Sequence, residues 1–313
     1  MLAKYSILRA LIWRYCGVAF IATAGLLAAG STSWAAEKAL RLLSSVPIPI
    51  SPTNTGTGTF SFDISFVDQS DGTYYLADRN NQAVDALFAD SIVKQIVPSA
   101  GHAPFAGISA TTTPPFSTAT AGPNGVVAAF PLLFVTDAPA RVLSFDLRQN
   151  PPLTVGDVTT LAGEPTRADE LAFDPKDRLI LAINNASTPP FGTLISVDTT
   201  GALAVVKNIF FDAAHGVDAQ NGAEQPVWDP GTQKFYLSIP QLGPVPTQGA
   251  VIRISTTGTV EATYLLTFCS PAGLALGPNE ELLANCNTIW ATNGSLWTGG
   301  MRIGILIPQR PNW

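Results

Sequence analysis

One motif recurs five times along this chain. Each copy is a short apolar strand, a turn rich in Gly, Pro, Asp or Asn, and a second apolar strand. The copies, 45 to 61 residues apart, are FDISFVDQSDGTYYLAD from Phe62, PNGVVAAFPLLFVTD from Pro123, ADELAFDPKDRLILAIN from Ala168, AEQPVWDPGTQKFYLSI from Ala223 and PAGLALGPNEELLAN from Pro271. A third and a fourth strand follow four of the copies. Four strands per repeat at this period predict an all-β fold, a β-propeller of four-stranded blades.

The apolar character of both faces of each sheet explains why the blades would stack around an axis. A lone sheet of this kind exposes its faces and edges, whereas radial stacking buries each face on the next blade. Abundant turn residues, with Gly 26 and Pro 25, and only 13% charged residues agree with many short strands. Five blades are visible, and six or seven are possible if repeats have diverged. We expect residues 39–50 to close the propeller as the outer strand of the last blade.

Three stretches depart from the repeat. Residues 98–121 are rich in Ser, Thr, Pro and Ala, carry no Asp, Glu, Lys or Arg, and predict a long loop between the first two blades. Residues 288–313 predict an irregular, truncated blade that contributes a strand or two, such as RIGILI. Residues 79–97 have near-helical apolar spacing, so a helix is an alternative there, but the register of the other repeats favours strands.

The N-terminus reads as an export signal. Basic residues precede the apolar run GVAFIATAGLLAAG, and small residues at 33 and 35 suit cleavage after Ala35. A membrane anchor is the alternative, but the run is shorter than the ~20 residues needed to span a bilayer. We therefore expect a signal peptide at 1–35 and one β-propeller domain at 36–313, secreted or periplasmic, monomeric and without stable membrane insertion. A net charge of −6 and the lack of a basic stripe argue against nucleic-acid binding.

Two cysteines, Cys269 and Cys286, flank the fifth motif. Between them lie two apolar runs around Gly277-Pro278-Asn279, which predict a hairpin that brings the cysteines face to face. An oxidising compartment would allow them to pair, so we expect a disulfide. The alternative is two buried free thiols. A zinc site is not indicated, because the chain holds only two histidines and lacks the ligand spacing of such sites.

Two motifs carry a resemblance to known propellers. The run YLADRNNQAVDALFAD resembles the NHL repeat, while PNG at 123–125 and ADELAFDPKDRLILA resemble the inner strands of the regucalcin/gluconolactonase-like family. This superfamily includes metal-dependent lactonases and esterases as well as non-catalytic binding propellers. The resemblance therefore implies a propeller and leaves the function open between these classes.

Aligned motifs place polar residues at one position, the start of each inner strand. Counting back five residues from the turn of each motif gives one column, formed by Asp63, Asn124, Asp169, Glu224 and Ala272. We expect these starts to converge on one mouth of a central channel. Carboxylate and amide oxygens suit Ca²⁺ or another divalent cation, and the regucalcin-like metal site uses a set of this kind. The metal ligands predicted are therefore Asp63, Asn124, Asp169 and Glu224, and a polar funnel with no ligand is the alternative.

The neighbours Glu170 and Gln225 should point away from the column, because successive strand side chains face opposite ways. A register error of one residue would exchange them with the column residues. His102 in the long loop and His215 in FDAAHGVDAQNG could enter the same mouth. As catalytic groups we single out Asp169 and His215, either of which could act as a general base.

The sequence contains no motif for phosphate binding or for a serine nucleophile. The chain has neither GxxxxGK[ST] nor GxSxG. Two hypotheses result. One is a non-catalytic propeller that binds an unidentified small molecule or protein at its central mouth. The other is a metal-dependent hydrolase of lactones or esters, in which a cation would polarise the carbonyl.

Overall fold

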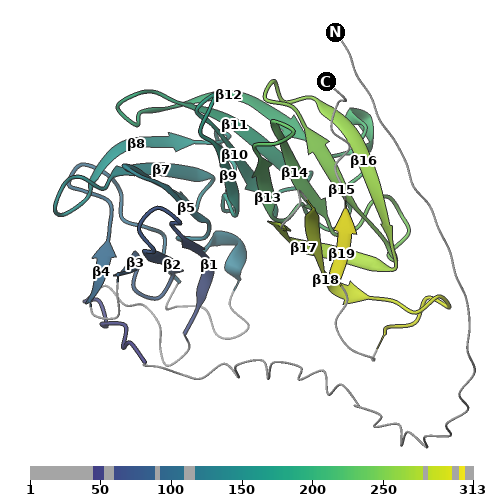
Figure 1. Ribbon diagram of the computed structural model, residues 1–313, viewed down its shortest axis with the longest axis horizontal. Coiled ribbons are helices and arrows are strands. Elements are labelled where there is room, and N and C mark those ends of the chain that lie inside the picture. Colours follow the sequence, from purple (N-terminus) through teal and green to yellow (C-terminus); the bar gives the residue numbers. More distant parts are fainter. Residues whose placement is uncertain are drawn as a thin grey trace, which may run out of the picture. The chain divides into compact units, whose positions relative to one another are not determined.

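The computed structural model describes residues 45–52, 60–88, 92–108, 117–277, 281–297 and 303–306, and Figure 1 shows it as a ribbon. Four blades of four strands lie around a common axis, and in each blade consecutive strands pair with one another. The first three blades are separate sheets, whereas the fourth shares a seven-stranded sheet with the strands that follow it. The first blade consists of β1 (Phe62–Val67), β2 (Tyr74–Asp78), β3 (Ala83–Phe88) and β4 (Ile92–Ile96), and the second of β5 (Val126–Ala129), β6 (Leu132–Asp137), β7 (Arg141–Asp146) and β8 (Leu153–Thr159). The third blade consists of β9 (Leu171–Asp174), β10 (Leu179–Asn184), β11 (Phe191–Val197) and β12 (Leu203–Phe210). The fourth consists of β13 (Pro226–Asp229), β14 (Lys234–Ile239), β15 (Gln248–Ile254) and β16 (Val260–Thr267). The prediction of an all-β propeller with four-stranded blades is confirmed.

Burial along the strands follows from blade stacking. Every residue of β6 and β7 is buried, because both faces of a middle strand pack on neighbouring blades. The outer strand β16 instead alternates between partly buried and exposed residues. Core clusters combine residues of adjacent blades: Phe134 of β6 packs with Ile180 of β10, and Leu181 of β10 packs with Phe235 of β14. The hydrophobic core is therefore a series of layers between sheets.

The fifth motif forms an antiparallel hairpin of β17 (Cys269–Leu276) and β18 (Leu282–Ile289). A disulfide joins Cys269 and Cys286, as predicted, and encloses a loop with a sequence separation of 17. In the tail, β19 (Ile303–Leu306) pairs with β18 and occupies the predicted RIGILI strand. The fifth repeat thus contributes three described strands, and a parallel bridge between Gln248 of β15 and Cys269 of β17 places them in the same sheet as the fourth blade.

Helical structure in the described residues is limited to two three-residue turns, η1 (Thr118–Thr120) and η2 (Ala213–His215). The helix alternative over 79–97 is wrong, since this stretch contains β3 and β4. No helix within the described ranges has the length and apolar character needed to cross a membrane. Part of the loop predicted at 98–121 is also described: Phe105 is buried against Phe145 of blade two, and η1 lies at its end.

The closing strand expected at 39–50 is corrected where the structure describes it. Residues 45–50 form no strand, and the carbonyl of Pro49 accepts hydrogen bonds from Asn81 Nδ2 and Gln95 Nε2 of the first blade, at 3.1 and 2.9 Å. This segment therefore contacts the first blade, whose own four strands are already complete. The remaining residues, 39–44, and the signal peptide predicted at 1–35 lie outside the described residues.

Removing the disulfide tests how much the hairpin depends on it. The double substitution C269A/C286A releases a constraint on a loop of 17 residues, which the chain-entropy model values at about 3 kcal/mol. We expect the free energy of unfolding in urea to fall by roughly that amount under oxidising conditions. With reductant present, wild type and variant should unfold at similar urea concentrations; a difference that persists would assign the loss to packing of the cysteine side chains instead.

A buried carboxyl pair lies in the first blade. Asp78 and Asp85 are both fully buried, and Asp78 accepts hydrogen bonds from the backbone and side chain of Asn81. Burial, followed by the adjacent charge of Asp78, raises the pKa of Asp85 to about 7. A carboxyl whose folded pKa lies above its unfolded value stabilises the fold while it is protonated. That contribution is complete below about pH 4 and is lost as the pH rises through about 7.

Asparagine at position 85 mimics the protonated acid, so D85N should retain this contribution at high pH. We expect the melting temperature of wild type to fall between pH 5 and pH 8 by more than that of D85N. At pH 8 the variant should be more stable by at least about 1 kcal/mol. The matched control is D177N, at an exposed turn position, which should follow the wild-type profile. Parallel pH profiles for D85N and wild type would contradict the assignment.

Candidate functional site

The inner strands begin at equivalent positions in three blades. The backbone N–H of Asn124 donates to Thr136 O at 2.9 Å, that of Asp169 to Ile183 O at 2.7 Å, and that of Glu224 to Ser238 O at 2.9 Å. Each bond joins the residue two positions before an inner strand to the penultimate residue of the adjacent second strand. The column obtained by counting back from the turns therefore corresponds to one structural position.

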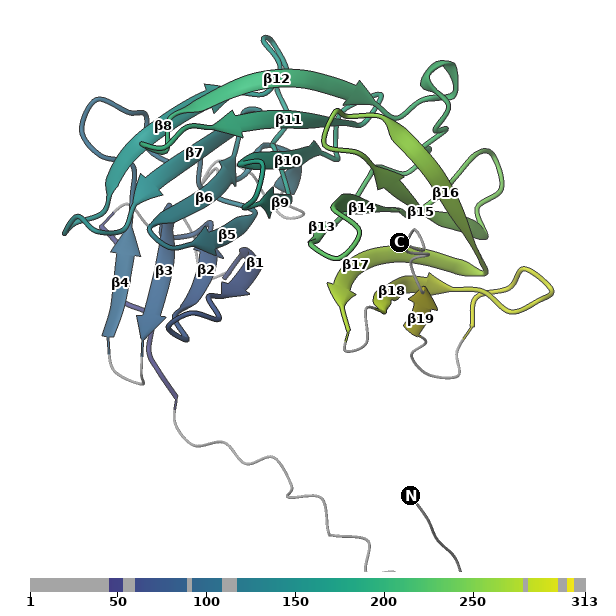
Figure 2. The same ribbon diagram turned by 45° about the horizontal axis from the view of Figure 1, so that its top comes forward.

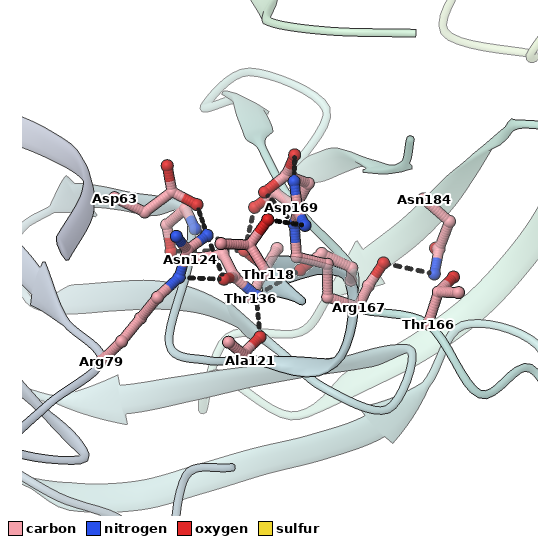
Figure 3. A network of polar contacts seen from close by, with 12 residues as sticks. Asp63, Arg79, Thr118, Ala121, Asn124, Thr136, Thr166, Arg167, Asp169 and Asn184 are labelled. Carbon is pink, nitrogen blue, oxygen red and sulfur yellow. Dashed lines mark hydrogen bonds and ion pairs between the residues drawn. The ribbon is translucent and has the colours of Figure 1, made fainter. Parts of the chain in front are cut away.

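Hydrogen bonds between blades hold these positions together. Ile64 N in the first blade donates to Asn124 O of the second at 3.1 Å, and Thr136 Oγ1 of the second donates to Asp169 O of the third. Gln225 N of the fourth donates to Ala272 O of the fifth motif at 3.3 Å. Each accepting carbonyl belongs to a column residue. The starts of the inner strands thus meet around the axis, as Figure 3 shows for the first three blades.

Arg79 connects two of the column side chains. Its Nη2 forms an ion pair with Asp63 Oδ2, and its Nε and Nη2 donate to Asn124 Oδ1 at 2.9 and 2.8 Å (Figure 3). The amide nitrogen of Asn124 donates to Ala121 O and Ala168 O at 2.9 and 3.0 Å. Asn124 is fully buried and Arg79 is 5% exposed. All hydrogen-bonding atoms of the Asn124 side chain are therefore used within the protein.

Arg167 holds the third column residue. Its Nε and Nη2 donate to the two oxygens of Asp169 at 2.7 and 2.8 Å, a bidentate pair, and Nη1 donates to Thr118 Oγ1 at 3.3 Å. The backbone N–H of Arg167 donates to Ala119 O at 2.7 Å. The end of the 98–121 loop is thereby fixed beside the axis by its η1 turn. We call Asp63, Arg79, Asn124, Arg167, Asp169, Glu170 and Glu224 the axial cluster.

The axial cluster contains more acidic than basic side chains, and the pKa values of several of its acids are raised. Burial, then the charge of Asp169, raises the pKa of Asp63 to about 7, although Arg79 and Arg167 act in the opposite direction. Burial also raises the pKa of Glu224, again with the charge of Asp169 adding to it. The pKa of Glu170 lies well above its ordinary value because its carboxyl is desolvated and faces the other acids. Part of the negative charge is thus removed by protons near neutral pH.

Glu170 was expected to point away from the column, and Gln225 likewise. The Gln225 side chain does so, since its Oε1 accepts a hydrogen bond from Leu274 N of β17 at 2.9 Å. Glu170 Oε2 is inaccessible to solvent and finds no hydrogen-bond partner among the described residues. The charges of Asp169, Glu224 and Asp63 nevertheless act on this carboxyl, so Glu170 belongs to the axial cluster.

A polar cavity of about 430 Å³ opens beside the cluster. Its lining offers a guanidinium, a carboxyl, two amides and two hydroxyls as hydrogen-bonding groups. The lining residues are Ser117, Thr118, Ala119, Arg167, Asn185, Ala186, Asn221, Gly222 and Glu224. A second cavity of about 410 Å³ shares four of these residues: Asn185, Ala186, Asn221 and Gly222. The site is open to solvent, and the third and fourth blades and the 98–121 loop offer donors and acceptors to a polar molecule that lies on it.

The two histidines lie elsewhere. His102 Nδ1 contacts Asp157 Oδ2 at 2.9 Å on the outer strand β8. His215 Nδ1 contacts Asp212 Oδ1 at 2.7 Å within its own turn, η2. Neither lines the polar cavity beside Arg167. Of the predicted catalytic residues, the structure places Asp169 in the axial cluster and His215 outside it, and a catalytic role for either stays a prediction.

The residues at the axis do not fit a divalent cation in this arrangement. In the part of the chain that the structure describes, no three His, Cys, Asp or Glu side chains form a group that could hold a metal. Asp63, Asn124 and Asp169 instead bind the guanidinium groups of Arg79 and Arg167, which supply the positive charge that an ion would bring. A metal ion with Asp63, Asn124, Asp169 and Glu224 as ligands stays a prediction, and we derive no reaction step from it.

Sequence reasoning missed Arg79 and Arg167. Arg167 stands two residues before Asp169, and side chains two apart in an extended segment face the same way, so the pattern contained this signal. Arg79 follows β2 in a turn, far from the position that was aligned. Its proximity to Asp63 and Asn124 depends on how two blades meet, for which the local pattern holds no signal.

Comparison with known proteins confirms the fold. No family model and no curated protein matches the chain. Among solved structures, hydrazine synthase of Kuenenia stuttgartiensis has 12% identity over 86% of this chain and 67% of that chain, with a TM-score of 0.57. The Dos1 propeller has 12% identity over 81% and 64%, with a TM-score of 0.51. A putative 6-phosphogluconolactonase from Bacteroides uniformis has 17% identity over 77% and 73%, with a TM-score of 0.48. The likeness to hydrazine synthase and to the Dos1 propeller, at 12% identity, shows a β-propeller and no specific function.

Replacing Arg79 by methionine tests the axial cluster. R79M removes the cation that binds Asp63 and Asn124, and leaves a buried amide and a partly buried carboxyl unpaired. We expect the free energy of unfolding to fall by about 2 kcal/mol at pH 8.5. The loss should be smaller at pH 5, where Asp63 is protonated in both proteins because its pKa is about 7.

Arg148 offers a matched control. It pairs with Asp146, but its side chain is 57% exposed, so R148M should change stability little at either pH. Equal losses for R79M and R148M, or a loss for R79M that does not depend on pH, would contradict the role given to Arg79. Urea unfolding at pH 5 and pH 8.5 measures all three proteins.

Proposed function

We propose that this chain is an exported, non-catalytic β-propeller that binds a small, polyhydroxylated molecule beside its axial cluster. The observation that carries the proposal is the polar cavity of about 430 Å³ between Arg167 and Glu224. Its volume lies in the range of small-molecule sites. Export is supported by the disulfide, because such bonds persist in oxidising compartments.

The chemistry of the lining argues for a ligand rich in hydroxyls. Hydroxyl groups both donate and accept, as do the amides of Asn185 and Asn221 and the hydroxyls of Ser117 and Thr118. Among the residues that the structure describes, no aromatic side chain lines this cavity, so an apolar ring finds no stacking partner in that part of the lining. The charges of Arg167 and Asp169 already neutralise each other in a bidentate pair, which favours a ligand without a strong net charge.

The fixed position of Arg167 is the second observation that supports the binding proposal. Arg167 is fixed by Asp169, Thr118 and the carbonyl of Ala119, while Asn184 Nδ2 donates to Arg167 O at 3.1 Å. A ligand that contacts Arg167 therefore meets a group whose position is set before binding. Preorganisation of this kind reduces the entropic cost of association.

Metal-dependent hydrolysis of a lactone or ester is the alternative function. In its favour, four acids gather at the axis, as such a site would require. Against it, arginines bind the predicted ligands Asp63, Asn124 and Asp169. The non-catalytic proposal rests on that pairing.

Titration calorimetry with a panel of neutral monosaccharides, gluconate and glucono-δ-lactone tests the binding proposal. We expect at least one neutral sugar to bind wild type, and E224Q to weaken it by at least tenfold, because the carboxylate loses its strong acceptor character. E261Q, on the outer strand β16, is the matched control and should bind like wild type. If no member of the panel binds, or if E261Q weakens binding as much as E224Q does, the proposal fails.

The same protein separates binding from hydrolysis. Metal analysis of the purified protein, followed by lactone and aryl-ester assays with and without chelator, should reveal no bound divalent cation and no chelator-sensitive turnover. A stoichiometric cation together with turnover that chelator abolishes would overturn the non-catalytic proposal and support the hydrolase.

A further inference from the structure

A separate cavity, of about 560 Å³, lies between the first two blades, away from the two cavities near the axis. It differs from the axial site in its elements and in its chemistry, since apolar side chains form much of its lining. These are Tyr75, Ala86, Phe88, Ile96, Phe130, Leu147 and Pro152. It also lies at the other end of the first blade: Asp63 stands near the start of β1, whereas Asp71 and Thr73, in the turn after β1, border this cavity.

One wall is a single face of the first blade. The register pairs Tyr75 with Ala86, and Ala86 with Lys94, so these three side chains form a row across β2, β3 and β4. Phe88 and Ile96 stand two residues from members of the row and share its face. The middle of the row is alanine, and its small side chain leaves space that a larger residue would fill. The hollow is therefore built into the sequence of the first blade.

The opposite wall comes from turns of the second blade. Phe130 lies between β5 and β6, and residues 147–152 connect β7 to β8. Two phenyl rings remain accessible at the cavity, since Phe88 is 55% and Phe130 60% exposed. Exposed aromatic side chains that border one hollow are typical of a surface that binds an apolar group.

The charged side chains at the cavity differ in whether they already form a salt bridge. Lys94 is exposed and forms no salt bridge with any described residue. Arg148 is bound through Nε and Nη2 to Asp146. Asp71 accepts a hydrogen bond from Thr73 N at 2.8 Å, which does not offset its charge, so an anionic group would lie on the Lys94 side of the cavity. An ammonium group next to apolar walls suits one negative charge on an otherwise apolar molecule.

We propose that this cavity binds a small aromatic or aliphatic molecule that carries a single carboxylate. The apolar body lies against Ala86, Phe88 and Phe130, and the carboxylate pairs with Lys94. An apolar lining with a small number of polar groups that fix orientation is the usual composition of a small-molecule site. The site is independent of the one beside the axial cluster, so either can fail without affecting the other.

Two probes that differ only in charge test the proposal, 2-naphthoate and 2-naphthalenemethanol. We expect calorimetry to detect binding of both to wild type, the carboxylate being tighter. K94Q should weaken naphthoate by about 3- to 5-fold and leave the alcohol within about twofold. F130A removes an exposed ring at small cost to the fold, and should weaken both probes.

K176Q is the matched control, an exposed lysine in a turn of the third blade, and should bind both probes like wild type. A86L, which fills the hollow, should abolish binding while its melting temperature confirms that it folds. Failure of naphthoate to bind wild type at millimolar concentration, or equal effects of K94Q and K176Q, would overturn the proposal. So would sedimentation that shows a dimer of wild type lost in F130A, because a second copy of the chain would then occupy the cavity.

Discussion

Burial of both faces of each sheet between neighbouring blades is the constraint on which this structure depends. It explains why β6 and β7 contain no exposed residue and why the core clusters always combine two blades. It also demands close approach near the axis. A side chain at Gly125 would place its Cβ 2.5 Å from the carbonyl oxygen of Asp169 in the next blade, so only glycine permits the second and third blades to meet there.

The same close approach creates an electrostatic problem at the axis. Inner-strand starts bring Asp63, Asp169, Glu170 and Glu224 together, and desolvated carboxylates repel one another. The protein answers in two ways. Arginines bind Asp63 and Asp169, and burial raises the pKa of Glu170 and of Glu224, which disfavours their charged forms. Buried ion pairs contribute little net stability, because desolvation offsets most of their attraction. Perturbed titratable groups beside a cavity are instead characteristic of functional sites.

The sequence patterns predicted the features that depend on the spacing of residues along the chain. They did not predict the contacts that form where two blades meet. Four strands per repeat, the Cys269–Cys286 hairpin and the column from Asn124 to Glu224 all follow from spacing along the chain. The closing strand was wrong over 45–50, where the carbonyl of Pro49 accepts hydrogen bonds from the side-chain amides of Asn81 and Gln95 instead of from a neighbouring strand. Arg79 shows the other limit. A cation in a turn of one blade reaches Asn124 of the next, and nothing in the local pattern of either repeat specifies that distance.

Blade geometry also explains why two cavities of different chemistry occur in one repeat fold. Near the axis, strands start close together, backbone carbonyls accept bonds from the preceding blade, and the space that remains is lined by the polar residues of connecting loops. At the other end of the first blade, the face of one sheet lies opposite turns of the second blade, and a small residue such as Ala86 on that face borders an apolar hollow. The residue types at a few lining positions then determine whether a cavity is polar or apolar. Lys94 beside Phe88 and Phe130 gives the second hollow a chemistry that the axial cluster, with its arginines already paired, does not have.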